Sequence, residues 1–250
     1  MYKRLKKELS PLFSLKLTIV CLAAFFVVLI MGTLYQSEHG LYAAQEKIFA
    51  SYFFLWKDFI PLPGLQLILI VLFVNLFSSI IFKTEFKPKN IGLNLTHLST
   101  LLLLLSVFLI AQFKEESYLS LQIGESTNIS KDYRLKEKEY TLPISIQLLD
   151  FTKKDYLGTD MAKSYESLVR INEKELYRKL RISMNKPLRY GFYTFYQASY
   201  SVDEFGEYHS KLAVSKNPLQ VLPYIFSILC SLGLLLHFFI KLFIYRKENS

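Results

Sequence analysis

The sequence has little cysteine, and none in the long polar block of residues 114–217. Its two cysteines, Cys21 and Cys230, both lie in long apolar runs. There is no CxxC pair, so the chain has no thiol–disulfide exchange pair of its own and no cysteine-rich metal site. We expect both thiols to act as small apolar residues that face lipid or a neighbouring helix.

Recognisable catalytic motifs are also absent from the polar block, which covers residues 114–217. The block has no Ser/His/Asp set, no paired carboxylates, no glycine-rich phosphate loop and no histidine pair with metal-ligand spacing. We therefore expect no complete catalytic set in this chain. His209 stands alone beside a charged segment, and we expect its side chain to be exposed.

Long apolar runs, in contrast, are abundant. Four of them cover residues 17–35, 65–82, 92–113 and 218–240, and each is close to the ~20 residues that cross a bilayer as a helix. The first run is too long for a cleavable signal peptide, and no small-x-small cleavage site follows it. The sequence therefore predicts a membrane protein with four transmembrane α-helices and an extramembrane domain between the third and the fourth.

The net charge of +9 is concentrated at three edges of these runs. The segments before the first run, between the second and third, and after the fourth carry 11 Lys/Arg and 3 Asp/Glu, whereas the polar block carries 17 and 15. All three segments fall on one side of a four-span topology, and the positive-inside rule makes that side the cytoplasm. The excess charge is thus a topology signal that contacts anionic membrane lipid, and we expect no nucleic-acid partner.

These boundaries give a complete expected topology with both termini in the cytoplasm. The cytoplasmic segments are residues 1–16, 83–91 and 241–250, and an extracytoplasmic loop covers residues 36–64. The extracytoplasmic domain covers residues 114–217.

The extracytoplasmic domain has the composition of a β-rich fold. Short runs of β-branched and aromatic residues occur at 141–151, 168–171, 180–184 and 190–200, with likely turns at Gly124 and Gly158. Residues 171–178 fit either a helical turn or a hairpin tip. The aromatic run at 190–200 is compatible with stacking on sugars or nucleic acid, but packing and interfacial anchoring are the simpler interpretation. The sequence predicts a sandwich-like β-domain.

Polar residues inside the third apolar run form a stripe on one face of the expected helix. Asn94, His97 and Thr100 are spaced by three, and His97 lies roughly 8 Å from the cytoplasmic end. A histidine in hydrocarbon is explained by an interhelical hydrogen bond, a proton relay, or a metal or haem ligand. His237 lies one turn before the end of the fourth run, where an interfacial role is sufficient.

Several segments in order along the chain resemble one known family. They are the LKLTIV that begins at Leu15, the GTLYQ at Gly32, the GLYAAQEK at Gly40, Asn75–Leu76, His97 and the NKPLRYGFYTFYQASY at Asn185. In this order they resemble the ResB/CcsB proteins of cytochrome c maturation, which act with CcsA/ResC. The likeness extends over nearly the whole chain, although many members carry a larger extracytoplasmic domain.

The resemblance implies a function in the bacterial cytoplasmic membrane. Such proteins help to carry haem b across the membrane for covalent attachment to the CxxCH cysteines of apocytochrome c. By position, His97 is the candidate axial haem ligand, Asn94 and Thr100 are candidates to orient its ring, and His237 is a weak candidate. The cations Lys83, Lys87 and Lys89, with Asn90, lie nearby and suit haem propionates.

The resemblance also implies partners. Trp56 is the single tryptophan, so the tryptophan-rich haem-binding segment must come from a separate CcsA/ResC-like membrane subunit. Apocytochrome c and a thiol-reducing thioredoxin-like protein are the further expected partners. The chain is thus expected to be a subunit of a cytochrome c haem lyase complex.

Three other functions compete with this interpretation. A membrane-tethered sensor that binds a ligand outside would need a cytoplasmic output domain, but the cytoplasmic segments are short. A transporter would normally show an inverted repeat or helices broken by glycine and proline. A b-type haem electron-transfer subunit would need two histidine ligands, for which His97 and His237 are the available pair.

Overall fold

The structure, a computed structural model, describes residues 2–57, 59–132, 138–159, 161–173 and 176–249. It divides into two compact units, which are considered separately here. The membrane unit contains residues 1–108 and 221–250, and the β-domain contains residues 109–220.

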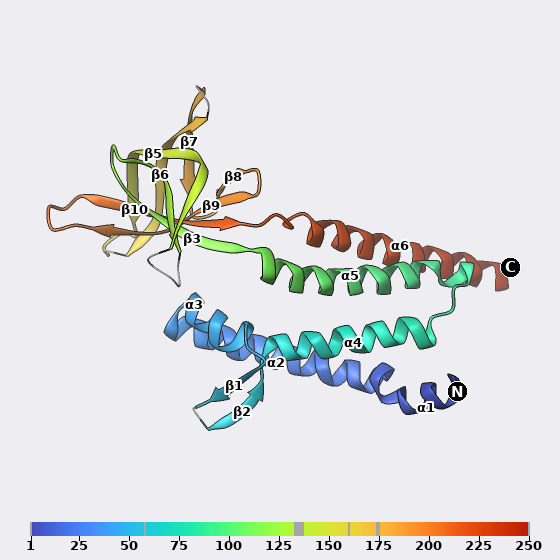
Figure 1. The fold of residues 1–250 in the computed structure, drawn as a ribbon. Helices are drawn as coiled ribbons and strands as arrows, with labels where there is room; N and C mark the ends of the chain where they lie inside the picture. The colour runs from blue at the N-terminus through green and yellow to red at the C-terminus, as the bar shows by residue number, and fades with distance from the viewer. Residues whose placement is uncertain (1, 58, 133–137, 160, 174–175, 250) are drawn as a thin grey trace. The chain divides into compact units, whose positions relative to one another are not determined.

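The membrane unit is built from long apolar helices. Among the described residues, four helices are long and apolar enough to cross a bilayer, which confirms the four predicted spans (Figure 1). They are α2 (Leu15–His39), α4 (Leu65–Lys83), α5 (Ile91–Phe113) and α6 (Leu222–Glu248). Two shorter helices, α1 (Tyr2–Glu8) and the 3-10 helix η1 (Ser10–Phe13), precede α2, and the 3-10 helix η3 (Pro88–Asn90) precedes α5.

Local sequence explains where α2 begins and ends. The side chain of Ser14 caps its first turn by accepting a hydrogen bond from the backbone N–H of Leu17 at 3.1 Å. At the other end Gly40 adopts a positive φ of 86°, a conformation that glycine reaches without steric cost. The helix therefore continues past residue 35, where the apolar run ends, and includes a polar last turn.

The loop between α2 and α4 is more structured than the sequence indicated. It contains α3 (Leu41–Ala44), the π-helical turn η2 (Gln45–Phe49), and a hairpin of β1 (Phe53–Trp56) and β2 (Ile60–Pro63). Ile48 and Phe54 are buried in one apolar cluster with Cys21 and Val28 of α2 and Ile68 of α4. This cluster fixes the loop against the ends of the two spans.

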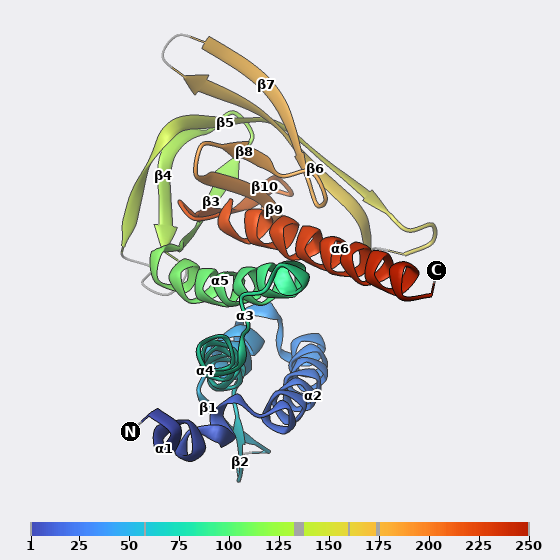
Figure 2. The same cartoon turned by 90° about the vertical axis from the view of Figure 1, so that its right-hand side faces the viewer.

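Small residues let α5 and α6 approach closely. A Cβ atom added at Gly92 would lie 2.3 Å from the backbone nitrogen of His237, and one added at Gly233 would lie 2.7 Å from the backbone nitrogen of Thr96. Close contact through glycine is a common way for helices to associate in lipid, where burial of apolar side chains gives no net drive. Figure 2 shows these two helices side by side.

The second unit is a β-domain, as predicted between the third and fourth spans. Eight antiparallel strands form one sheet in the order β7-β6-β5-β4-β3-β10-β9-β8. Their bounds are β3 (Glu115–Gln122), β4 (Ser126–Asp132), β5 (Glu139–Asp155), β6 (Ala162–Glu173), β7 (Leu176–Ser183), β8 (Leu188–Tyr190), β9 (Tyr193–Val202) and β10 (Tyr208–Lys216).

The sandwich-like character of this domain comes from one sheet that folds over on itself. β7 contacts both β8 and β9, so the two ends of the sheet face each other across a shared core. That core includes Leu148, Val169, Phe195 and Leu212, none of which has exposed surface. Of the two interpretations of residues 171–178, the hairpin is confirmed, because Glu173 pairs with Leu176 across β6 and β7.

Candidate functional site

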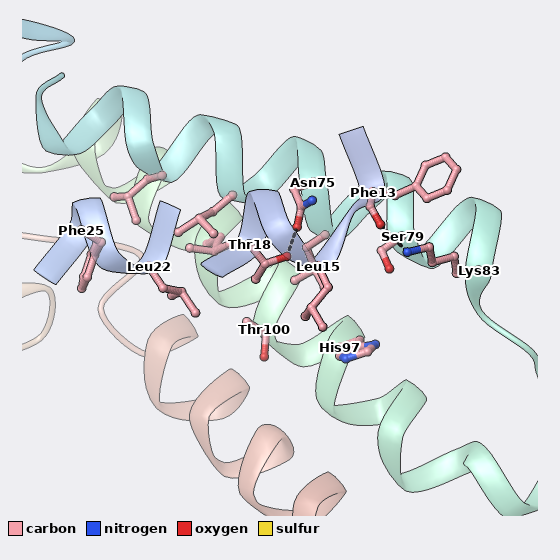
Figure 3. Close-up of a pocket in the computed structure, with 14 residues that line it drawn as sticks. Phe13, Leu15, Thr18, Leu22, Phe25, Asn75, Ser79, Lys83, His97 and Thr100 are labelled. Carbon is pink, nitrogen blue, oxygen red and sulfur yellow. Dashed lines mark hydrogen bonds between the residues drawn. The ribbon is translucent and has the colours of Figure 1, made fainter. Parts of the chain in front are cut away.

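A cavity of about 500 Å³ lies within the membrane unit (Figure 3). Its volume falls within the range of small-molecule and cofactor sites. α2, α4 and α5 supply its wall, and η1 contributes one residue, Phe13. Its apolar lining consists of Phe13, Leu15, Leu22, Phe25, Leu69, Leu72, Leu76 and Leu104.

The cavity also receives six polar side chains. His97 and Thr100 come from α5, Thr18 from α2, and Asn75, Ser79 and Lys83 from α4. α4 places Asn75, Ser79 and Lys83 on one face because they are spaced by four residues. The result is a mostly apolar space with one imidazole and one ammonium group.

Asn75 has a structural role at the cavity wall. It is 4% exposed, accepts a hydrogen bond from the Thr18 hydroxyl at 2.7 Å, and donates to the backbone carbonyls of Leu12 at 2.7 Å and Ser14 at 3.2 Å. Its carboxamide thus joins α4 to the junction between η1 and α2. All of these groups would be costly to leave without partners in lipid.

Lys83 joins the same two segments at the end of α4. Its ammonium group donates a hydrogen bond to the carbonyl of Phe13 at 2.6 Å and lies 5.2 Å from the centre of the Phe13 ring. The Phe13 ring in turn stacks on Phe82, with 5.4 Å between ring centres. Since an ammonium group has three donors, Lys83 has capacity for an anionic group as well as for this carbonyl.

The imidazole of His97 lines the cavity without a hydrogen bond to any described residue. The candidates to orient the ring are engaged elsewhere. Asn94 does not line the cavity, and its amide donates to the backbone carbonyl of Glu85 at 3.1 Å. Thr100 lines the cavity, but its hydroxyl donates to the carbonyl of Thr96 at 2.9 Å. The oxygen of Thr100 still has acceptor capacity, so its proposed role toward His97 stays a prediction.

His237 is not among the residues that line the cavity. It lies on α6 against Gly92, and its Nδ1 atom is buried without a hydrogen-bond partner among the described residues. The structure therefore does not bring His97 and His237 to one site. Cys230, also on α6, lies with its Sγ atom 3.6 Å from the Thr100 hydroxyl, which agrees with a thiol that faces a neighbouring helix.

Of the three lysines from the end of α4 to η3, one lines the cavity. Lys83 lines it, whereas Lys87 forms an ion pair with Glu85 at 2.9 Å. The hydrogen bond from Lys87 is the main reason why the pKa of the Glu85 carboxyl is lowered from its usual value. Neither Lys87, Lys89 nor Asn90 lines the cavity.

The donor set suits a large apolar molecule that carries a metal ion and anionic groups. A neutral imidazole nitrogen is a haem iron ligand, the leucine and phenylalanine side chains suit a porphyrin ring, and an ammonium group suits a propionate. Among the described residues, no group of three or more His, Cys, Asp or Glu side chains could hold a metal ion. Of the described residues that line the cavity, His97 is the one with a side chain that commonly ligates iron.

Part of this site was not foreseen from the sequence. His97, Asn75, Ser79 and Lys83 stand out as polar residues in or beside apolar runs. Thr18 and Phe13 do not, because their place at the cavity depends on how α2 crosses α4. A threonine in a span commonly bonds to its own helix backbone, so its sequence carries no signal of a partner on another helix.

Comparisons with known proteins bear on both units. No curated protein matches the chain. A solved structure of "Cytochrome c Heme Lyase CcmF" is similar over 90% of this chain and 34% of its own length, at 15% identity and a TM-score of 0.37. The chain thus spans about a third of that protein's length.

A model of the ResB-like family matches residues 88–210. The matched segment contains η3, α5 with His97, and strands β3 to β9 in full. This match supports a role in cytochrome c biogenesis for a multi-pass membrane protein. The resemblance seen in the sequence is confirmed over this segment, which is similar to the ResB-like family.

Proposed function

We propose that this chain carries haem b across the bacterial cytoplasmic membrane and presents it for attachment to apocytochrome c. The observation that carries the proposal is the position of His97 at an apolar cavity within the membrane unit, together with the ammonium group of Lys83. The match of residues 88–210 to the ResB-like family supports the maturation role. The cavity volume supports a ligand of cofactor size.

The side chains would divide the work of holding haem by their chemistry. The imidazole of His97 would ligate the iron, and Lys83 would pair with a propionate. The leucine and phenylalanine side chains would exclude water from the ring. Bound haem is the group that the complex transfers, so this chain needs to hold and release it and needs no catalytic set of its own.

Topology and partners complete the proposal. Both termini would lie in the cytoplasm, which places the β-domain outside the membrane. A CcsA/ResC-like subunit with a tryptophan-rich segment would supply the opposing iron ligand, because His237 does not line the cavity. A thioredoxin-like protein would keep the CxxCH cysteines of the apocytochrome reduced.

A resident b-type haem for electron transfer is less well supported. Such a site normally needs two histidine ligands from the same bundle, and only His97 lines the cavity. The sensor and transporter alternatives have no observation in the structure that favours them.

The test is a His97→Ala variant copurified with its membrane partner. We expect it to lose nearly all bound haem while the protein remains inserted, because the change removes a polar group from hydrocarbon and leaves no unpaired donor. Imidazole in the medium should partly restore the haem, since it can enter the vacated space and ligate the iron. Haem is measured by absorption spectroscopy, and cytochrome c assembly by haem staining of the membranes.

His237→Ala is the matched control, since it removes the same group from a span without reaching the cavity. It should retain most of the haem. If His97→Ala keeps full haem and full cytochrome c assembly, the ligand assignment is wrong and an interhelical hydrogen bond becomes the explanation for His97.

A further inference from the structure

The hairpin of β1 and β2 presents an apolar surface that no described residue of the membrane unit covers. Phe53 is 67% exposed, Leu55 is 49% exposed and Phe59, next to the turn, is 70% exposed. On the opposite face Phe54 is buried and packs with Leu62 on the cluster formed with α2 and α4. The hairpin is therefore apolar on both faces. One face packs on the protein, and the other is exposed.

The hairpin is fixed at the end of a membrane span. β2 ends at Pro63, and α4 begins two residues later at Leu65. Between them the backbone N–H of Gly64 donates to the carbonyl of Tyr52 at 2.7 Å. A Cβ atom at Gly64 would lie 2.1 Å from the carbonyl oxygen of Ser51, so the base of the hairpin lies directly against the start of the helix. The hairpin thus lies at the depth of the membrane boundary.

The direction of the hairpin follows that of the membrane surface. Figures 1 and 2 both show it projecting sideways from the pair α2 and α4, on the side away from α5 and α6. At the same end of α2, Ile30 and Leu34 are exposed apolar residues of the span. The exposed face of the hairpin is thus apolar, as are these exposed residues at the same end of α2.

Two prolines remove the backbone donors from one of the two edges of the hairpin. Pro61 and Pro63 lie opposite Leu55 and Phe53 in the ladder. Proline has no N–H, so these positions cannot donate to β1, and their backbone nitrogens point to the outer edge of β2. That edge has no donor to offer an added strand. It is also cheaper to place at a lipid boundary than an edge with unpaired N–H groups.

We propose that the β1–β2 hairpin is an interfacial anchor whose outer face lies among phospholipid headgroups and the first part of the acyl chains. Phe53, Leu55 and Phe59 enter the apolar side of this boundary. Trp56 and Tyr52 have the chemistry that is enriched there, and Lys57 at the turn can extend its ammonium group to the phosphates. The proposal concerns the lipid contacts of this chain and does not depend on haem binding.

Because Trp56 is the single tryptophan, fluorescence can report on this hairpin alone. The full chain is reconstituted in phosphatidylcholine vesicles that contain lipids brominated near the headgroup or near the chain end. Trp56 packs partly on the apolar cluster, so the decisive variant is Phe53→Trp in a Trp56→Phe background, which puts the probe on the exposed face. Phe205→Trp in the same background is the control, since Phe205 is 90% exposed in the turn between β9 and β10.

We expect the Phe53→Trp probe to emit at short wavelength and to lose most of its emission to lipids brominated near the headgroup. Lipids brominated near the chain end should quench it less, and acrylamide in the water should quench it weakly. The Phe205→Trp control should show the reverse. Strong quenching by acrylamide without quenching by lipid overturns the proposal. Protection from both quenchers also overturns it, because a second copy of the chain or another protein must then cover the face.

Discussion

Asn75 in the membrane unit and Gln197 in the β-domain are both carboxamides with about 5% of their surface exposed, but they bond to different kinds of group. Asn75 donates to two backbone carbonyls at the break between η1 and α2. Gln197 accepts from Ser167 at 2.6 Å and donates to Ser210 at 3.1 Å and to the backbone carbonyl of Ser199 at 3.2 Å, so two of these three partners are side chains.

The difference follows from how each unit satisfies its backbone. In the sheet, ladder hydrogen bonds occupy most main-chain groups, so a buried polar side chain bonds mainly to other side chains. In the membrane unit, a break between helices leaves carbonyls without helical partners, and lipid offers none. Asn75 thus compensates for the break between η1 and α2, whereas Gln197 belongs to a polar network inside a core.

The largest loss of stability that we expect comes from a substitution in the core of the β-domain. Phe195 has no exposed surface and packs in the main apolar cluster, so Phe195→Ala should destabilise this domain by about 3–5 kcal/mol. Hydrogen–deuterium exchange on the full chain should show faster exchange throughout strands β3 to β10. The amides of α2 and α4 should not change.

The neighbouring residue offers a matched control for this prediction. Tyr196 lies on the other side of the strand and is 42% exposed, so Tyr196→Ala should have a much smaller effect on the same amides. Equal effects of the two variants would show that Phe195 is not a central core residue.

The second prediction compares the two carboxamides directly. Asn75→Leu leaves the carbonyl of Leu12 without its donor in lipid, whereas the Ser14 carbonyl keeps its bonds from Thr18, so we expect a loss of about 1–3 kcal/mol. Gln197→Leu should cost less, because the hydroxyls of Ser167 and Ser210 still bond to each other at 2.7 Å. Thermal unfolding of each variant in detergent, followed by circular dichroism, measures both losses. A larger loss for Gln197→Leu would contradict the distinction drawn between the units.

The sequence is sufficient to predict the four spans and the β-domain because these follow from hydropathy and from the period of short β-branched runs. His97 could be singled out because histidine in an apolar run is costly. The cavity could not be predicted, since it depends on the angle at which α2, α4 and α5 cross. The β1–β2 hairpin was missed because its continuous apolar sequence has no polar alternation to mark strands.

The expectation for His209 was wrong for a related reason. Its side chain is 20% exposed and lies 3.3 Å from the Asp203 carboxylate and 3.1 Å from the Gln122 amide. Gln122 is distant in sequence and pairs with His209 only because β3 and β10 are neighbours in the sheet. A single-sequence interpretation has no access to such a partner.

The smallest effect concerns the turn between β9 and β10, which depends on one carboxylate rather than on a core. Asp203 accepts backbone hydrogen bonds from Glu207 at 2.8 Å and from Phe205 at 2.9 Å. The bond from Glu207 is the main reason why the pKa of Asp203 is lowered from its usual value, with His209 and Phe205 adding to it.

Because the pKa of Asp203 is lower in the folded state, this stabilisation is present above the ordinary aspartate pKa of about 3.9 and is lost as pH falls through the lower folded value. The protection of the Gly206 amide, which is its intrinsic exchange rate at each pH divided by the observed rate, should therefore be unchanged near neutral pH and should fall only in acid. Asp203→Asn keeps an acceptor oxygen for the turn but removes the titrating group, so it should abolish the acid dependence while the turn persists. An unchanged acid dependence in Asp203→Asn would assign the effect to another group.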